Sequence, residues 1–238
     1  MTDIAIPILM YHQISTPPER GTPCRALYVA PERFRRQMLW LKRAGFVGLS
    51  LRDIESYLRS GNSGRVVGIT FDDGFRNVFA NALPVLQEMG FTATNFFVSR
   101  QIGGHNAWDE NIGMPFAPCM SKAEVREWSA AGNEVGAHTL DHVRLSELPV
   151  AAARRQIFHS KFELEDLTGE EVRSFSYPWG DVSDEVRDLV GQAGFTSAVT
   201  TRSAWARGKD DELLLPRVEI GRKNGWLATL YKCFVEPR

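Results

Sequence analysis

The sequence lacks features that define several classes of protein. Its three cysteines, Cys24, Cys119 and Cys233, lie far apart and form no CxxC pair, so they predict no disulfide framework and are typical of a reducing compartment. No apolar run approaches the roughly 20 residues of a membrane span. The amino terminus lacks the basic segment and apolar stretch of a signal peptide. These absences favour a cytoplasmic protein, free or at the inner membrane surface, with no integral membrane segment.

An excess of positive charge is also absent. The 238 residues include 28 Lys and Arg against 29 Asp and Glu, a formal net charge of −1, which argues against a nucleic-acid partner bound by broad phosphate attraction. The GxSxG nucleophile elbow, the GxxxxGK[ST] phosphate loop and the GxGxxG dinucleotide fingerprint do not occur, so nothing points to the enzymes that depend on them.

What the sequence does contain is an alternation of apolar runs and helically spaced segments. Strands are expected at 6–11, 66–71, 92–98, 135–137, 173–177, 195–200 and 213–220, and helices at about 34–44, 51–59, 78–89, 121–132 and 150–167 and from 183 and 224 onward. Repeated strand–helix alternation predicts an α/β fold with a parallel sheet covered by helices. No Ser- or Gly-rich linker interrupts it, so we expect one domain over residues 1–238. Periodicity leaves an open sheet and a closed barrel as alternatives.

Two adjacent carboxylates, Asp72 and Asp73, directly follow the apolar run 66–71. One carboxylate can hold a cation while the other accepts a proton. Regular strand alternation would point them to opposite faces, so both reach one site only if the strand has ended, and Gly74 permits that turn. The alternative is a polar loop that caps a helix.

Two histidines, His138 and His142, follow the short run 135–137 within the segment HTLDH. Imidazoles four residues apart can face one cation. A pair of surface histidines flanking a turn is the alternative. A third segment, Ser176 to Gly180, places Trp179 between Pro178 and Gly180, in a sharp turn that can expose backbone N–H groups to an oxyanion. An aromatic turn packed on the core is the alternative there.

In this order, the segments TFDDG, HTLDH and YPWG resemble the three leading motifs of the NodB-homology polysaccharide deacetylases, carbohydrate esterase family four. The resemblance covers roughly residues 4–220. It implies a single-domain distorted (β/α) barrel with seven strands. It also implies a hydrolase that removes N-acetyl groups from sugars with one divalent metal, zinc first, with cobalt, nickel or manganese as alternatives.

Carried over by position, the resemblance assigns Asp73, His138 and His142 as metal ligands. It assigns Asp72 as the general base that takes a proton from a metal-bound water. It places Trp179 where the family uses a backbone N–H as the oxyanion donor.

Two departures accompany the resemblance. The family's third motif carries an arginine, paired with the base carboxylate, where this chain has Ser176. Arg217, in the expected strand 213–220, is the first candidate to replace it. Arg173 is a weaker candidate because it begins its strand, and a structural surface arginine is the alternative for both.

The second departure is that no histidine follows His159, although the family's fifth motif supplies a catalytic acid there. The segment ILMYH, ending in His12, has the same form at the opposite end of the chain. It is similar to the poly-N-acetylglucosamine deacetylase branch, whose motifs are circularly permuted. We therefore expect His12 to be the acid, with His105 and His159 as alternatives.

The expected substrate is an N-acetylated sugar or glycan, including nucleotide-linked or lipid-linked intermediates, and Trp108, Trp179 and Trp205 are candidates to stack on a sugar ring. Two rival functions stay open. One is hydrolysis of another amide or an acetyl ester, and the other is a catalytically idle carbohydrate-binding barrel, which the missing third-motif arginine makes more credible. The sequence does not predict the oligomeric state.

Overall fold

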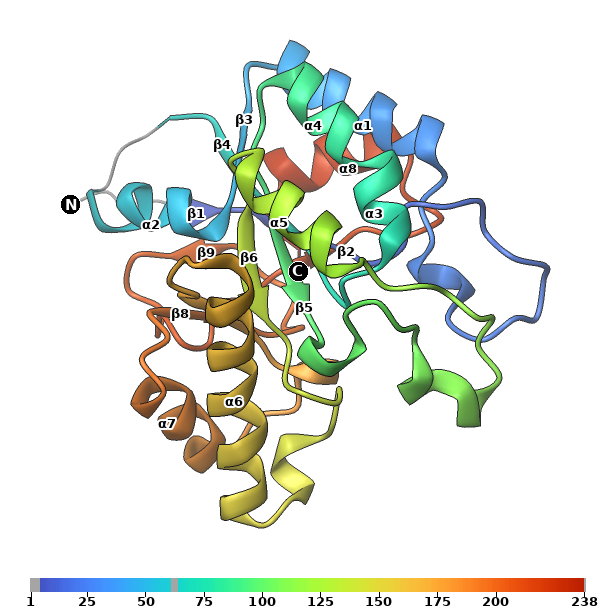
Figure 1. Ribbon diagram of the computed structural model, residues 1–238. Coiled ribbons are helices and arrows are strands. Elements are labelled where there is room, and N and C mark those ends of the chain that lie inside the picture. Colours follow the sequence, from blue (N-terminus) through green and yellow to red (C-terminus); the bar gives the residue numbers. More distant parts are fainter. Residues whose placement is uncertain (1–4, 61–63, 238) are drawn as a thin grey trace.

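Eight of the described strands lie in one curled, parallel sheet with helices around it (Figure 1). The computed structural model describes residues 5–60 and 64–237. Along the sheet the strands follow the order β10–β2–β4–β5–β6–β7–β8, and β3 pairs with the first half of β4. The strands are β2 (Ile8–Tyr11), β3 (Val47–Leu49), β4 (Val66–Phe71), β5 (Thr94–Phe97), β6 (Glu134–Ala137), β7 (Ser174–Ser176), β8 (Ser197–Val199) and β10 (Val218–Glu219). The predicted α/β fold with a distorted, seven-stranded barrel is therefore confirmed.

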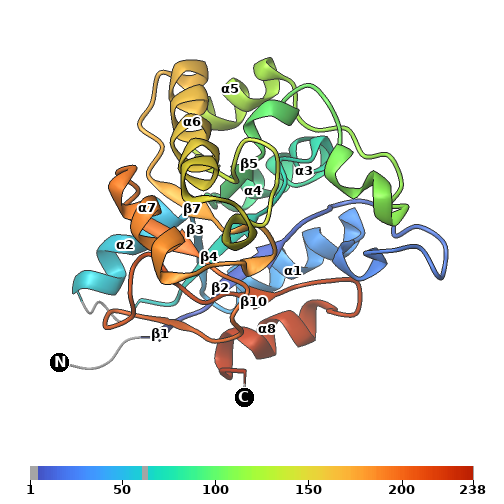
Figure 2. The same cartoon turned by 90° about the horizontal axis from the view of Figure 1, so that it is seen from below.

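Helices connect these strands and cover the outside of the sheet, as the view from below shows (Figure 2). They are α1 (Pro31–Arg43), α2 (Leu51–Ser60), α3 (Arg76–Asn81), α4 (Leu83–Met89), α5 (Lys122–Ala130), α6 (Val150–Thr168), α7 (Asp184–Gln192) and α8 (Trp226–Phe234). A two-stranded antiparallel ribbon, β1 (Ala5–Ile6) with β9 (Ala206–Arg207), lies apart from the main sheet. None of the described helices has the length and apolar content needed to cross a bilayer.

Local sequence signals explain several helix ends. Ser121 and Glu124 form the predicted capping box at the start of α5, and Gly169 ends α6 in the left-handed conformation that glycine adopts at little cost. The single helix expected at 78–89 is instead two, α3 and α4, separated at Ala82. Pro84 lies in the first turn of α4, and a proline cannot donate the backbone hydrogen bond that would continue α3.

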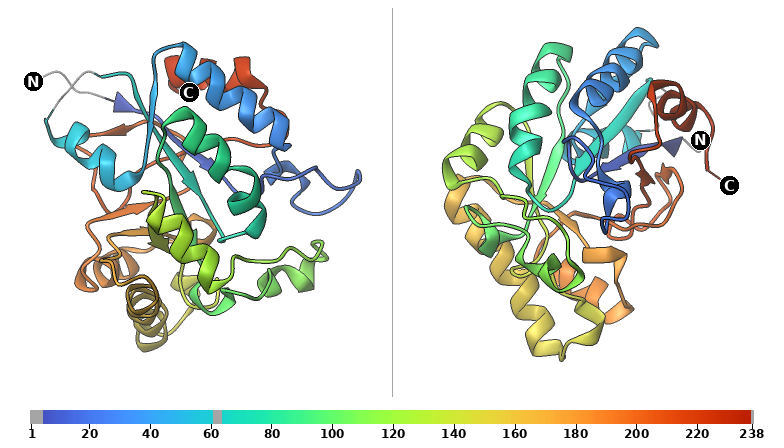
Figure 3. Two further views of the ribbon diagram at one scale, coloured as in Figure 1. Left: turned by 45° about the horizontal axis from the view of Figure 1, so that its top comes forward. Right: turned by 90° about the vertical axis from the view of Figure 1, so that its right-hand side faces the viewer.

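The predicted strand 213–220 is wrong over most of its length. Only Val218–Glu219 forms a strand, paired with β2, while Leu215 makes an isolated bridge with Val199 of β8. Pro216 separates the two halves and has no N–H for a ladder. One segment therefore contacts both edges of the sheet, and it brings the curled strands close to closure (Figure 3).

The chain's first long strand does not lie at an edge. β2 pairs with β10 on one side and with β4 on the other, so a strand from the amino terminus occupies the position next to the last strand of the chain (Figure 2). This is the neighbour relation expected of a circularly permuted motif order. The short strands β3 and β9 are missing from the sequence prediction because two or three residues give no periodic signal.

Apolar side chains fill both faces of the sheet. Alternate residues of a strand point to opposite faces, so Leu9 joins the large cluster beneath the helices while Ile8 joins a smaller one. The smaller cluster contains Phe96, Leu51 and Leu215. Hydrophobic burial on two faces explains why β4 is an unbroken run of buried residues.

A buried carboxylate ties the amino-terminal ends of the strands together. Glu134, on β6, accepts hydrogen bonds from the backbone N–H of Arg52 at 2.9 Å, from Thr94 Oγ1 at 2.6 Å and from Ser174 Oγ at 2.6 Å. These donors belong to α2, β5 and β7. Burial raises the pKa of Glu134 although the hydrogen bonds lower it, so the three hydrogen bonds offset only part of the cost of burying its charge.

Replacing Glu134 tests this arrangement. Glu134→Leu removes the acceptor of the Thr94 hydroxyl and of the Arg52 N–H and leaves Ser174 with Ser197 alone, so we expect the free energy of unfolding to fall by about 3 kcal/mol. Glu134→Gln keeps an acceptor oxygen and lets its NH2 group donate to Ser174, so its loss should be smaller. Urea denaturation of both variants measures the difference, and equal losses would contradict the role of the hydrogen bonds.

The difference in the free energy of unfolding between wild type and Glu134→Gln should depend on pH. Because the folded-state pKa of Glu134 is raised, its contribution to stability is fully present below the unfolded-state pKa and is lost as the pH rises through the folded-state value. Wild type should therefore lose stability relative to Glu134→Gln over that interval.

Candidate active site

The segments that follow the strands surround a pocket of about 110 Å³ at the carboxyl ends of the sheet. Parallel strands bring their carboxyl ends to one edge, where ligands usually bind. His12 follows β2, Asp72 and Asp73 follow β4, and His138 and His142 follow β6. Trp179 follows β7 and also lines the pocket. The three sequence motifs and His12 thus meet in one place.

Asp72 is held by a buried arginine. Arg217 Nη1 donates to Asp72 Oδ1 and Arg217 Nη2 donates to Asp72 Oδ2, both at 2.7 Å. Both residues are almost fully buried, with exposed fractions of 3% for Asp72 and 1% for Arg217. Burial alone would raise the pKa of Asp72, but the charge and hydrogen bonds of Arg217 bring it below its ordinary value. The carboxylate is therefore ionised at neutral pH.

Every N–H of the Arg217 guanidinium has an acceptor. Besides Asp72, Nη1 donates to Thr70 Oγ1 at 3.1 Å, Nη2 to Ser176 Oγ at 3.1 Å and Nε to the carbonyl of Thr200 at 3.0 Å. Ser176 is the residue that stands where the third motif is expected to carry an arginine. Its short side chain accepts a hydrogen bond from the guanidinium that arrives from residue 217, while Arg173 pairs with Glu171 at the surface.

Asp73, His138 and His142 place three ligand atoms around one point. All three side chains are buried, and their ligand atoms lie within 4.8 Å of one another. Asp73 Oδ1 is 3.4 Å from His138 Nε2 and 3.3 Å from His142 Nε2. Tetrahedral ligands about 2.1 Å from a zinc ion lie roughly 3.4 Å apart. The spacing of Asp73 Oδ1 from the two histidine nitrogens therefore fits a cation of this kind.

The hydrogen bonding of His138 supports the same fit. Its Nδ1 lies 2.7 Å from the carbonyl oxygen of Ser176, and only a protonated Nδ1 can donate to that oxygen. In the neutral ring, Nε2 then carries a lone pair that faces the Asp73 carboxylate. Two acceptors in contact repel each other, so a positive charge between them is favourable.

His142 is enclosed by aromatic rings. The ring centroids of Trp108 and Trp179 lie 4.8 Å and 4.3 Å from that of His142, and the guanidinium of Arg144 covers Trp179 at 4.7 Å. Burial lowers the pKa of His142, although the nearby Asp73 opposes this shift. A lowered pKa favours the neutral imidazole, the form that binds metals.

The loops of the site adopt an uncommon backbone conformation. Five non-glycine residues have positive φ, namely Cys24, Asp73, Thr139, His142 and Trp179, among the residues that the structure describes. All but Thr139 line the pocket. Such conformations cost about 1–3 kcal/mol each and cluster at functional sites.

The turn in the Asp72–Asp73 segment depends on glycine. β4 ends at Phe71, and both Asp73 and Gly74 have positive φ. A Cβ added at Gly74 would lie 2.7 Å from the Phe97 ring, so only glycine fits. The predicted strand end is observed, and it brings two consecutive carboxylates to one pocket.

The turn at Trp179 lies beside the pocket. Trp179 has φ 55°, Pro178 before it has no N–H, and the N–H groups of Tyr177 and Gly180 are used within the fold. Tyr177 N–H donates to the carbonyl of Val199, and Gly180 N–H donates to the carbonyl of Tyr177. The N–H of Trp179 is the candidate donor to a bound oxygen.

Of the three candidate acids, only His12 is in the pocket. Its Nε2 lies 4.0 Å from Asp72 Oδ2. His105 instead pairs with Glu110 at 2.7 Å and stacks on Phe116, and His159 is exposed on α6. Neither is among the residues that line the pocket.

The sequence did not predict two polar residues of the pocket. Gln13 follows His12, and Asp109 lies in the 3-10 helix Ala107–Ile112 next to Trp108. Burial raises the pKa of Asp109 to about 6, and the negative charge of Asp73 adds to this shift. A glutamine after a strand and an acid in a long loop give no motif, so only their place in the fold identifies them.

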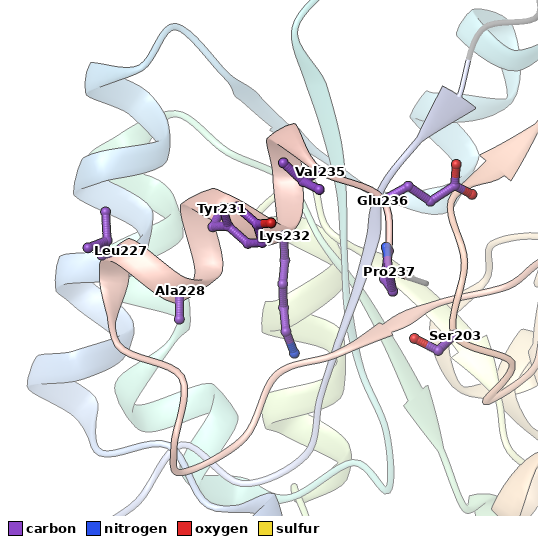
Figure 4. Close-up of a pocket in the computed structure, with 8 residues that line it drawn as sticks. All are labelled: Ser203, Leu227, Ala228, Tyr231, Lys232, Val235, Glu236 and Pro237. Atoms are coloured by element: carbon purple, nitrogen blue, oxygen red, sulfur yellow. The ribbon is translucent and has the colours of Figure 1, made fainter.

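A larger hollow lies elsewhere, beside α8 (Figure 4). It has a volume of about 1050 Å³, and Leu227, Tyr231 and Lys232 line it. It includes no histidine or aspartate, so it offers none of the chemistry of the small pocket. Trp205 belongs to this region, where its Nε1 donates to the carbonyl of Lys232, and it is therefore not a sugar-stacking residue of the pocket.

Comparison with known proteins gives consistent matches. The chain is 27% identical over 217 residues to YxkH of Bacillus subtilis strain 168, covering 90% of this chain and 71% of YxkH. It is 25% identical over 214 residues to the poly-beta-1,6-N-acetyl-D-glucosamine N-deacetylase of Staphylococcus epidermidis, covering 86% and 71%. Its fold matches the Streptococcus pyogenes deacetylase PplD with a TM-score of 0.85 and 24% identity, over 99% of this chain and 100% of that one.

A family model described as polysaccharide deacetylase matches residues 59–198. The match covers more than half of the 238 residues and includes both carboxylates, both histidines and the Trp179 turn. The chain therefore belongs to the polysaccharide deacetylase family.

Proposed function

We propose that the protein is a metal-dependent N-deacetylase acting on a polymer of N-acetylated amino sugars. The observation that carries the proposal is one pocket that contains a complete ligand set and an ionised, arginine-held carboxylate. The name of the Staphylococcus epidermidis relative, a poly-beta-1,6-N-acetyl-D-glucosamine N-deacetylase, supports N-acetylglucosamine polymers as the substrate class. Nucleotide-linked and lipid-linked sugars, and the cytoplasmic location, stay predictions from the sequence.

Asp73, His138 and His142 would hold the cation, with zinc as the first candidate. When bound, such an ion lowers the pKa of a water molecule and polarises a carbonyl oxygen. Asp72 would take the proton of the attacking water, since its carboxylate is ionised and lies beside Asp73. Arg217 would keep Asp72 ionised and fix its direction.

The remaining roles concern charge that develops on the substrate. The N–H of Trp179 would donate to the acetyl oxygen as it becomes negative, a contribution of about 3 kcal/mol for a well-placed donor. His12 would protonate the departing nitrogen, because an amide anion is too basic to leave unaided. Acetate and a free amine are the products.

The contacts of Arg217 also favour an enzyme over an idle carbohydrate-binding barrel. A binding protein has no need of a buried carboxylate, because burying a charged pair costs free energy that an apolar pair would not. Acetate release from N-acetylglucosamine oligomers, with and without added zinc, tests the proposal. Absence of acetate release with zinc bound would overturn it.

Loss of a ligand should remove both metal and activity. For Asp73→Asn and His138→Ala, we expect bound zinc, measured by mass spectrometry, to fall well below one equivalent, and acetate release to be lost. His159→Ala is the matched control, because that histidine is exposed and remote from the pocket. Full activity in a metal-free Asp73→Asn preparation would reject the ligand assignment.

Replacing Arg217 should change both the pH profile and the stability. In Arg217→Gln, burial is no longer offset, so the pKa of Asp72 should rise and the acidic limb of kcat/KM should move to higher pH. The unpaired buried carboxylate should also lower the free energy of unfolding by about 3–5 kcal/mol.

The double variant Asp72→Asn with Arg217→Gln separates these two effects. Because it removes both buried charges, it should recover much of the lost stability while staying inactive. If Arg217→Gln alone retained the wild-type pH profile, Arg217 would have no role in setting the state of Asp72.

The role of His12 depends on the leaving group. His12→Ala should lose most activity on the sugar amide, whose nitrogen needs a proton, and should retain hydrolysis of 4-nitrophenyl acetate, whose phenolate leaves without one. Bound zinc should stay unchanged. Equal losses on both substrates would mean that His12 acts in some other way.

A further inference from the structure

Gln13 has a buried amide nitrogen with no partner. The residue is 1% exposed, and its Nε2 has no hydrogen-bond partner among the described residues. It lines the pocket beside His12. Two N–H groups that face neither water nor an acceptor cost free energy in the folded protein.

The orientation of this amide is fixed by its surroundings. The backbone N–H of Ile14 donates to Asn77 Oδ1 at 2.9 Å, so Asn77 must present its Nδ2 elsewhere. That Nδ2 donates to Gln13 Oε1 at 2.7 Å. Since Oε1 faces a donor, the Nε2 of Gln13 is the atom left without a partner, and an amide flip would place two donors against each other.

A second buried glutamine shows that this protein can satisfy such a group. Gln37 is also 1% exposed. Its Oε1 accepts from Tyr11 Oη at 3.2 Å, and its Nε2 donates to the carbonyl of Asn224 at 2.8 Å. Gln37 is not among the pocket residues. The unpartnered donor is thus found on the glutamine that lines the pocket.

We propose that Gln13 binds substrate, with its Nε2 donating to an oxygen of the sugar that carries the acetamide. The proposal rests on the proposed function. The polar side chains of the pocket include three carboxylates, Asp72, Asp73 and Asp109, which accept hydrogen bonds or hold a cation. A hydroxyl or ring oxygen of a sugar needs a donor, and Gln13 supplies a neutral one next to His12.

A hydrogen bond to an oxygen that does not react is equally strong before and during the reaction. Such an interaction lowers KM and the dissociation constant and leaves kcat nearly unchanged. Gln13 therefore determines how the sugar is held, and Asn77 is the positioning residue that aims it.

Gln13→Glu removes the donor, because its carboxylate keeps an oxygen for Asn77 and has no NH2 group; it also adds a negative charge beside His12. We expect KM for a β-1,6-linked N-acetylglucosamine oligomer to rise by about tenfold, the scale of one lost hydrogen bond, with kcat within about twofold in the neutral variant Gln13→Met. Calorimetry of the same oligomer with the zinc-loaded Asp72→Asn chain, with and without Gln13→Glu, should show the same change in Kd.

Gln13→Met, which is neutral, decides the matter if Gln13→Glu does not fold, and Gln37→Met is the matched control. Gln37→Met should lower the melting temperature and leave Kd unchanged. An unchanged Kd in the Gln13 variants overturns the inference, as does a failure of the Asp72→Asn chain to bind the oligomer. If the oligomer binds in a way that depends on Gln13 but the wild type releases no acetate, the deacetylase proposal is overturned. The binding role of Gln13 is then retained.

Discussion

The ion pair between Arg217 and Asp72 is the interaction on which the site depends. A guanidinium and a carboxylate buried together are stable only when their remaining hydrogen-bonding capacity is used, and each N–H of Arg217 has an acceptor. The acceptors come from β4, from β7 and from the residue after β8. The pair therefore ties the end of β4 to the ends of β7 and β8, which lie further along the sheet, and the pocket keeps its shape because the Asp72 carboxylate is also part of the core.

The same segment that carries Arg217 joins the two edges of the sheet. Leu215 pairs with β8 and Val218 with β2. Arg217 therefore lies on the segment that runs from one edge of the curled sheet to the other. His12 stands at the end of β2, between β10 and β4. Because chemistry depends on spatial neighbours, His12 from the start of the chain can lie 4.0 Å from Asp72 in its first third.

The sequence predicted those parts of the site that are encoded locally. Asp73, His138 and His142 follow buried strands in short motifs, and parallel strands must bring such ends together. Arg217 was predicted as the residue that replaces the motif arginine, at whose position this chain has Ser176, and in the structure it contacts Asp72. The sequence could not predict the role of Gln13. Its Nε2 is left without a partner because Asn77, 64 residues away, donates to its Oε1. The prediction of a continuous strand at 213–220 was wrong because it gave the apolar residues on both sides more weight than Pro216, which has no N–H for a ladder.

The backbone at the site shows what the chemistry demands of the fold. Consecutive residues of a strand point to opposite faces, so two adjacent carboxylates share a pocket only if the chain reverses between them. Asp73 does this with φ 77°, in a region that an aspartate tolerates better than most residues. His142 and Trp179 are held in the same way. This strain of a few kcal/mol is sustained by the large buried cluster beneath the helices, which lets the loops adopt the conformation that brings these side chains to one pocket.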